Sequence, residues 1–290
     1  MPRVVLIAAL ERSGSTIFDL VLGHHPNVIS LGEVERVIKP HAHSGLSDLD
    51  DRLCTCGEPV LACPFWGVVV ERIRAAGVDS LADRYRIFFG AVDDVFGKDQ
   101  VIVDSSKTVD ALKTVALTAP SKFNVIHLIR DVRGWTNSIR QAEKRKRELP
   151  WRRILEPNFR PFWVSYVRHN ILRAIPGFVP VEWALRNHRL MRVIRAEGWS
   201  CHAVAYDLLA LNPQETLDRL FAFLDLDAID LNRAGAPTHH IVRGNRTAFS
   251  GRPVLPLRYD HSWFGRTPTP ADLVLYPVYL LNRAWLYRSD

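Results

Sequence analysis

The stretch that decides the fold is Val4-Val5-Leu6-Ile7-Ala8-Ala9, followed by Leu10-Glu11-Arg12-Ser13-Gly14-Ser15-Thr16 and then by Ile17-Phe18-Asp19-Leu20-Val21-Leu22. Its first part has the continuous apolar run of a buried parallel strand, and its last part has the pattern of a helix. A strand, a tight turn and a helix start leave unpaired backbone N–H groups that converge on one point, which suits an anion. The sequence therefore predicts an anion-binding loop between a first strand and a first helix.

This loop differs from that of nucleoside triphosphatases, in which Gly-x4-Gly-Lys-Ser/Thr places Lys on the phosphates and Ser/Thr on magnesium. Ala9 stands in place of the first Gly, and Ser15 stands in place of the Lys. Arg12 supplies a positive charge, and Ser13 and Thr16 supply hydroxyl donors beside Ser15. A loop without its Lys is poorly suited to a nucleoside triphosphate, but it can hold a smaller anion without a metal ion.

The composition allows one large α/β core, since the chain has 290 residues of which 47% are hydrophobic. A net charge of +7 favours anionic ligands, although nucleic acid and acidic membranes also fit such a charge. The apolar run before Glu11 is too short for a secretory signal, and no apolar stretch reaches the length of a membrane span. We therefore expect a cytoplasmic protein without a transmembrane segment.

Strand-like runs alternate with helical patterns along the chain, which predicts βαβ units around a central parallel sheet flanked by helices. The expected strands are 4–9, 101–104, 123–129 and 202–206, with a short one at 28–30. The expected helices are 15–24, 66–76, 79–95, 108–118, 133–147, 180–197, 213–224 and 271–287. The segment from about 145 to 180, rich in aromatic residues, Pro and Arg, is expected to form a helical and aromatic lid insertion.

Polar and charged side chains follow three of the expected strands, at the sheet edge where ligands bind in such folds. The loop 12–16 follows the first strand, Ser105-Ser106-Lys107 follows strand 101–104, and Arg130-Asp131 follows strand 123–129. With Arg133 and Ser138 on the next helix, Arg130 predicts a second anion site, so the ligand is expected to be charged at both ends. The alternative is that Arg130 and Arg133 pair with Asp131 or Asp104.

Three cysteines lie close together in the sequence, as Cys54-Thr55-Cys56 and Cys63. A zinc site would need a fourth ligand, and the spacing is not the usual Cys-x2-Cys, although His41 and His43 lie nearby. The sequence leaves a zinc site, a disulfide and reduced packing residues open, and it favours the last. Cys201 lies in an apolar run and is expected in the core.

The order of motifs along the chain resembles that of a known enzyme family. It runs Arg12-Ser13-Gly14-Ser15-Thr16, His25-Pro26-Asn27, Gly32-Glu33-Val34-Glu35-Arg36, Asp104-Ser105-Ser106-Lys107, Leu128-Ile129-Arg130-Asp131-x-Arg133-Gly134 with Ser138, Tyr206-Asp207-Leu208-Leu209, Asn212-Pro213 and His240-x3-Gly244-Asn245. This order is similar to that of sulfotransferases that use 3′-phosphoadenosine 5′-phosphosulfate (PAPS), of the bacterial carbohydrate and tyrosylprotein types. The resemblance implies one sulfotransferase-like domain over 1–290, with a P-loop-like parallel sheet and with acceptor-pocket insertions at about 37–100 and 145–180.

The resemblance also implies which residues hold the donor PAPS and its product, the bisphosphate PAP. The loop of Arg12, Ser13, Gly14, Ser15 and Thr16 corresponds to the site of the 5′-phosphosulfate. Arg130 and Ser138 correspond to the site of the 3′-phosphate. His240, Gly244 and Asn245 correspond to a loop that closes over the nucleotide. The Arg that often follows this Asn is absent because position 248 is Ala, and Arg243 or Arg246 are its possible substitutes.

For the chemistry, the resemblance implies in-line transfer of a sulfuryl group to a hydroxyl or amine, with no metal expected. The general base corresponds to Glu33, with Glu35 as the alternative, since an acceptor hydroxyl must lose its proton as the new bond forms. Lys107 neutralises charge on the leaving oxygen, and Arg36 positions the acceptor. The ordinary interpretations are that Glu33 pairs with Arg36 and that Lys107 is a surface lysine.

The expected partner is a small-molecule, carbohydrate or lipid-linked hydroxyl acceptor, and the sequence does not specify the oligomeric state. Aromatic and histidine side chains of the two insertions either stack on the acceptor or belong to the core; they are His41, His43, Trp66, Trp151, Phe159, Phe162, Trp163 and Tyr166. The alternative function is that of a P-loop small-molecule kinase, against which Ser15 argues. No nucleic-acid partner is expected, because the basic residues form no single stripe interleaved with aromatics.

Overall fold

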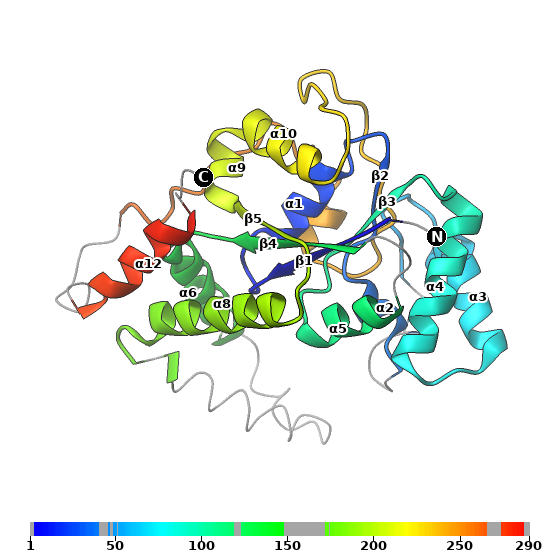
Figure 1. Ribbon diagram of the computed structural model, residues 1–290, viewed down its shortest axis with the longest axis horizontal. Coiled ribbons are helices and arrows are strands. Elements are labelled where there is room, and N and C mark those ends of the chain that lie inside the picture. Colours follow the sequence, from blue (N-terminus) through cyan, green and yellow to red (C-terminus); the bar gives the residue numbers. More distant parts are fainter. Residues whose placement is uncertain are drawn as a thin grey trace.

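A five-stranded parallel sheet with the strand order β2-β3-β1-β4-β5 lies at the centre of the computed structural model (Figure 1). The structure describes residues 3–40, 46, 49–50, 52–118, 123–147, 172–173, 175–265 and 274–286. The strands are β1 (Arg3–Ala9), β2 (Val28–Ser30), β3 (Val101–Asp104), β4 (Phe123–Ile129) and β5 (Cys201–Ala205). All neighbouring strands run parallel, which confirms the predicted α/β fold with a parallel sheet.

The helices lie between the strands, as the alternating sequence pattern predicts. They are α1 (Ser15–Leu22), α2 (Val34–Ile38), α3 (Trp66–Ala76), α4 (Leu81–Phe96), α5 (Val109–Thr118), α6 (Val132–Arg147), α8 (Phe178–Ala196), α9 (Tyr206–Leu211), α10 (Pro213–Phe223) and α12 (Tyr276–Leu286), with 3₁₀ turns η2 (Val60–Ala62) and η5 (Arg246–Phe249). The described part of the chain contains no helix with both the length and the apolar character needed to cross a bilayer.

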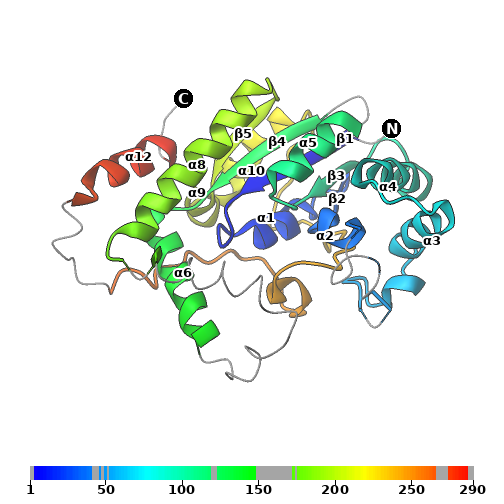
Figure 2. The ribbon, with the colours of Figure 1, turned by 90° about the horizontal axis from the view of Figure 1, so that it is seen from below.

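Helices cover both faces of the sheet, which explains why the central strands are apolar without alternation. On one face, Val5 and Ile7 of β1 pack against Phe18 of α1 and against α10. On the other face, Val4 and Leu6 pack in a cluster with residues of α4, α5 and α8. Figures 1 and 2 show α1 and α10 on one side of the sheet and α5 and α8 on the other.

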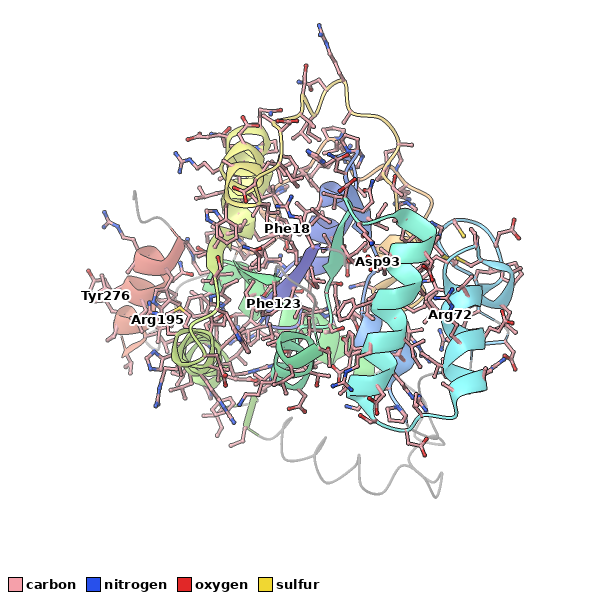
Figure 3. All side chains as sticks on the ribbon, turned by 45° about the vertical axis from the view of Figure 1, so that its right-hand side comes forward. Phe18, Arg72, Asp93, Phe123, Arg195 and Tyr276 are labelled. Carbon is pink, nitrogen blue, oxygen red and sulfur yellow. The ribbon has the colours of Figure 1, made fainter. Side chains whose placement is uncertain are left out.

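The region 37–100 contains a helical annex, in which α3 and α4 lie side by side at the β2 side of the sheet (Figure 3). Its aromatic side chains extend the hydrophobic cluster of Val4 and Leu6, with the rings of Phe65 and Trp66 5.1 Å apart and those of Phe65 and Phe88 5.7 Å apart. Trp66 is fully buried here and is therefore a core residue. An acceptor-pocket role for 37–100 stays a prediction, and the expected lid at 145–180 lies largely outside the described residues.

Two sequence expectations need correction at β5, the strand at one edge of the sheet. Cys201 is exposed rather than in the core, because it is the first residue of this edge strand. Tyr206 was expected to end the strand, but it begins α9, which the sequence pattern did not predict. His41, His43 and the aromatic candidates at 151–166 lie outside the described residues.

A buried carboxylate, Asp19 of α1, connects the first helix to the ends of two strands. Its Oδ1 accepts a hydrogen bond from the Ser30 hydroxyl at 2.5 Å. Its Oδ2 accepts from the Ser105 hydroxyl at 2.9 Å and from the Gly32 N–H at 3.1 Å. Complete burial raises the pKa of Asp19 to about 7, although the hydrogen bonds from Ser30 and Ser105 oppose this shift. Asp19 therefore fixes the segments that follow β2 and β3 relative to α1.

We expect Asp19→Ala to lower the free energy of unfolding by at least about 3 kcal/mol at pH 5, where Asp19 is protonated, because its three buried hydrogen-bond partners lose it at roughly 1–3 kcal/mol each. Urea unfolding followed by circular dichroism measures this loss. The control is Asp94→Ala, which removes the exposed pair with Arg72 and should cost less than about 1 kcal/mol. Equal losses in the two variants would contradict a bracing role for Asp19.

Wild type and Asp19→Ala also test the raised pKa of Asp19. Folding raises the pKa of Asp19 from 3.8 to about 7, so the folded state holds this proton more tightly than the unfolded state. The stability that this contributes is fully present below the unfolded pKa and is lost as the pH rises through the folded pKa. The difference in unfolding free energy between wild type and Asp19→Ala should therefore shrink between about pH 4 and pH 7.

Candidate functional site

A cavity of about 950 Å³ at the carboxyl ends of the strands brings together nearly all the residues that the sequence singles out. The predicted residues that line it are Arg12, Gly14, Ser15, Thr16, Glu33, Arg36, Lys107, Arg130, Ser138, Gly244 and Asn245. Ser13 is the exception: it is buried inside the loop, and its N–H donates to the carbonyl of Leu10 at 3.3 Å. The sequence analysis gave no role to four further residues that line the cavity: Glu11, Thr247, Arg258 and Asp260.

The predicted anion loop joins the end of β1 to the first residue of α1. Two of its residues have positive φ angles, Arg12 with 67° and Gly14 with 90°. A Cβ on Gly14 would lie 2.2 Å from the ring of Tyr206, so only glycine lets the loop rest on this ring. The backbone N–H groups at the start of α1 and the hydroxyls of Ser15 and Thr16 thus meet at the cavity.

Arg130, which follows β4, forms the second cationic part of the cavity. Its Nη1 donates to the carbonyl of Arg12 at 2.8 Å, its Nη2 pairs with Asp260, and its guanidinium lies 5.5 Å from the ring centre of Tyr206. Among the residues that the structure describes, no partner accepts a hydrogen bond from its buried Nε. Ser138, on α6, lines the same cavity. An additional anionic acceptor fits this arrangement, since buried donors are rarely left unpaired.

The neighbouring arginine, Arg133, has a structural role instead. It pairs with Asp131 at 2.7 Å, and its guanidinium lies 4.1 Å from the ring centre of Trp263. The alternative interpretation of the sequence, in which these arginines pair with Asp131 or Asp104, therefore holds for Arg133 and fails for Arg130.

Glu33 lies at the start of α2 and bonds to two cations. Its Oε1 accepts from Lys107 Nζ at 2.7 Å, and its Oε2 accepts from Arg36 at 2.6 Å. Burial acts to raise the pKa of Glu33, but the ion pairs with Lys107 and Arg36 outweigh it and hold this pKa below its ordinary value of 4.5. Glu33 is therefore a carboxylate at neutral pH. The ordinary interpretation, in which it pairs with Arg36, describes a contact in the structure, and its role as the general base stays a prediction.

The alternative base, Glu35, is not among the residues that line either cavity. Its carboxylate accepts from Lys39 at 3.0 Å and from the Thr108 hydroxyl, and its side chain is only 3% exposed. Because a general base must reach the proton that it removes, this geometry favours Glu33 over Glu35.

A second cavity of about 560 Å³ adjoins the first and shares Glu11, Glu33, Arg36 and Lys107 with it. Residues of α8 line its far side, among them Arg186 and Arg189. Glu33 and Lys107 therefore lie where two cavities meet, with the anion loop and Arg130 only in the larger one. Such a site can bring two molecules together at one carboxylate.

The segment 238–245 runs beside β2 and forms part of the cavity wall. Ser30 N–H donates to Thr238 O at 3.1 Å, and Glu33 N–H donates to Arg243 O at 3.1 Å. A Cβ on Gly32, which has a φ of 71°, would lie 2.8 Å from that same Arg243 oxygen, so this approach requires glycine. Gly244 and Asn245 line the cavity as expected.

His240 differs from its expectation, because its ring contacts the sulfur atoms of Cys54 and Cys63 rather than the cavity. The two candidate substitutes for the missing arginine remain unassigned. Arg243 is buried, and it is absent from the residues that line the cavity; the side chain of Arg246 lies outside the described residues. Arg258, which lines the cavity, is the additional cation that the structure reveals.

Comparisons with known proteins show the family and the fold of this chain. The sequence model described as "Sulfotransferase family" matches residues 2–230. The structure is similar to the sulfotransferase domain of the Synechococcus PCC 7002 olefin synthase, with 18% identity, a TM-score of 0.56, and coverage of 97% of this chain and 94% of that one. It is also similar to the sulfotransferase domain from the curacin biosynthetic pathway, with 16% identity, a TM-score of 0.51, and coverage of 96% and 98%. At these identities the likeness shows the fold alone. No curated protein sequence matches the chain significantly.

We expect Lys107→Met to raise the pKa of Glu33, because the variant keeps most of the side-chain volume but removes one of the two charges that lower this pKa. Carbon-13 NMR titration of labelled glutamate carboxyls measures the change. Lys113→Met is the control, since Lys113 pairs with Glu197 on the surface and lies outside both cavities. An unchanged Glu33 titration in Lys107→Met would mean that Arg36 alone sets this pKa.

Proposed function

Because the chain belongs to the sulfotransferase family, we propose that it moves a sulfuryl group from PAPS to a hydroxyl or amine of an acceptor. One observation carries this proposal: two cationic groups at neighbouring strand ends face one cavity, and an ionised Glu33 lies between that cavity and a second one. A ligand with phosphate groups at both ends fits the first feature, and a base beside the point of transfer fits the second.

The larger cavity would hold the donor through its two cationic parts. The loop Arg12–Thr16 would bind the 5′-phosphosulfate with backbone N–H groups and the hydroxyls of Ser15 and Thr16. Arg130 and Ser138 would bind the 3′-phosphate, and the Nε of Arg130, which has no acceptor among the described residues, supports this assignment. Gly244 and Asn245 would cover the nucleotide from the segment beside β2.

PAPS supplies a sulfuryl group whose bond to the phosphate oxygen breaks as a new bond to the acceptor oxygen or nitrogen forms. Glu33 would take the proton that the acceptor loses, and it is already in the carboxylate form that a base requires. Lys107 would stabilise the charge that develops on the leaving oxygen. As Lys107 turns toward that oxygen it would release Glu33, and the basicity of Glu33 would rise at the moment the proton is transferred.

The acceptor would reach Glu33 from the smaller cavity. Glu33 and Lys107 line both cavities, whereas the anion loop Arg12–Thr16 does not line the smaller one. Arg36 lines both cavities and would position the acceptor. The acceptor class remains the one proposed from the sequence, a small-molecule, carbohydrate or lipid-linked hydroxyl compound.

We propose that this transfer needs no metal ion in the cavity. Each carboxylate that lines the larger cavity already bonds to a cation within the described residues: Glu11 to Arg186, Glu33 to Lys107 and Asp260 to Arg130. Such pairs leave little negative charge for the magnesium ion that a kinase requires. Together with Ser15 at the position of the loop Lys, this argues against the kinase alternative.

We expect the protein to bind PAP without added metal, and Arg130→Ala to weaken binding by about tenfold or more, because a charge-assisted hydrogen bond contributes roughly 1.5–3 kcal/mol. Ser138→Ala should weaken it less, since it removes a neutral donor. Isothermal titration calorimetry measures both effects. Arg72→Ala is the control, as Arg72 lies on α3 (Figure 3), pairs with Asp94 and is not among the residues that line the cavity.

Unchanged PAP affinity in Arg130→Ala would remove the assignment of the 3′-phosphate site. A thermal-shift comparison with PAP, ATP with magnesium, and an oligonucleotide separates the proposed function from its alternatives. Stabilisation by PAP alone supports the sulfotransferase, whereas stabilisation only by ATP with magnesium supports the kinase.

We expect Glu33→Gln to keep its affinity for PAP but to lose about 10²–10⁴ in kcat, because the amide cannot accept the acceptor's proton. Lys107→Ala should also lower kcat, since it removes a donor to the leaving oxygen. Labelled PAPS with any accepted substrate gives the rates. Glu35→Gln is the matched control and should stay within a few-fold of wild type; the opposite order of the two glutamine variants would make Glu35 the base.

A further inference from the structure

Three cysteines and one histidine meet on the side of segment 238–245 that faces α3. The ligand atoms of Cys54, Cys56, Cys63 and His240 all lie within 4.8 Å of one another. Cys56 Sγ and Cys63 Sγ are 3.7 Å apart, and His240 Nδ1 lies 3.3 Å from Cys63 Sγ and 3.8 Å from Cys54 Sγ. The four groups come from a short loop and from a segment 177 residues further along the chain.

Three of these separations are close to the edges of a tetrahedron around zinc. With Zn–S bonds of about 2.3 Å and Zn–N bonds of about 2.0–2.1 Å, a tetrahedral ion places two sulfurs about 3.8 Å apart and a sulfur and a nitrogen about 3.6 Å apart. Three of the six pairs, at 3.3 to 3.8 Å, lie close to these values, and the other pairs of ligand atoms lie within 4.8 Å of each other. Three thiolates and one imidazole are also a donor set that soft and borderline divalent ions prefer.

We propose that Cys54, Cys56, Cys63 and His240 form a structural zinc site. The set is closed, with four protein ligands and no position left for water or substrate, as in zinc sites that stabilise a fold rather than catalyse. The site is separate from the proposed sulfuryl transfer, because none of its ligands lines the cavity that holds Glu33. It therefore goes beyond the proposed function and does not depend on it.

The local backbone already presents the sulfur atoms in one direction. The loop is closed by hydrogen bonds from Cys54 N–H to Glu58 O at 2.8 Å and from Gly57 N–H to Cys54 O at 3.0 Å. The N–H of Trp66, at the start of α3, points to Cys63 Sγ at 3.4 Å. A backbone N–H that donates to sulfur favours the thiolate, which is the form that binds metal.

Neither alternative from the sequence accounts for the whole cluster. A disulfide would use two of the three sulfurs and leave the third thiol and the imidazole without a reason to converge. Packing alone accounts for the buried Cys54 and Cys63, but not for Cys56, which is exposed yet faces the same point.

The site would fasten the segment that completes the larger cavity. Backbone bonds already join the two parts: Thr55 N–H donates to Ile241 O at 3.0 Å, and the Trp66 indole donates to His240 O at 2.5 Å. Three residues after His240, the backbone carbonyl of Arg243 accepts a hydrogen bond from the N–H of Glu33. The next residue, Gly244, lines the cavity. A metal at His240 would therefore hold this wall in place from outside.

The test measures metal directly. We expect elemental mass spectrometry to find about one zinc per chain in protein purified under reducing conditions. Cobalt substitution should give the absorption bands of a tetrahedral thiolate site. Cys56→Ser and His240→Ala should lose the metal. His240→Cys, which restores a ligand, should retain it, and Cys201→Ser is the matched control because Cys201 is an exposed cysteine outside the cluster.

Three results would overturn the proposal. They are wild-type protein that holds no zinc even after reconstitution with the metal, a cluster disulfide detected by mass in the protein as isolated, and full zinc content in Cys56→Ser. If a variant fails to fold, the metal content and cobalt spectrum of wild type and Cys201→Ser still decide the outcome. Metal content is independent of PAP binding, so failure of one proposal leaves the other standing.

Discussion

The whole site depends on the buried carboxylate of Asp19. Its three hydrogen bonds hold Ser30 at the end of β2, Gly32 two residues later and Ser105 after β3. Glu33 directly follows the first of these segments, and Lys107 lies two residues beyond the second. The hydrogen bonds of Asp19 therefore position the ion pair between Glu33 and Lys107, although Asp19 itself does not line the cavity. A fully buried acid is costly, and this one is tolerated because each of its oxygens is hydrogen-bonded.

Ion pairs with carboxylates offset the repulsion among the cations that line the cavity. Lys107 and Arg130, two of its cations, bond to the cavity carboxylates Glu33 and Asp260. Backbone strain opposes this stabilisation, since Arg12 and Lys107 have positive φ angles of 67° and 68° and both line the cavity. Each such conformation costs of order 1 kcal/mol and persists where the surrounding structure imposes it. An anionic ligand that takes over these cations would use an arrangement the fold already maintains.

The sequence predicted the local elements and most residues that line the cavity, but it did not predict the long-range contacts that hold those residues in place. The buried runs 4–9 and 123–129 and the turn between β1 and α1 carry their own signals, so the sheet and the anion loop were predicted. The partners of Asp19 lie 11 to 86 residues away, and no periodic pattern connects them. Asp260, the partner of Arg130, is separated from it by 130 residues and belongs to no motif. The structural roles of Asp19 and Asp260 could therefore not be predicted from the sequence.

The irregular backbone of the segment from 231 to 245 gives a physical reason for the proposed zinc site. It lies beyond the stretch 2–230 that matches the family, and its described residues form no helix or strand apart from a single bridge between His239 and Ser30. A chain without regular structure has high conformational entropy, and a few backbone bonds offset only part of it. A tetrahedral site that joins His240 to a loop near the annex would remove much of that freedom, so that Gly244 and Asn245 would reach the cavity already ordered.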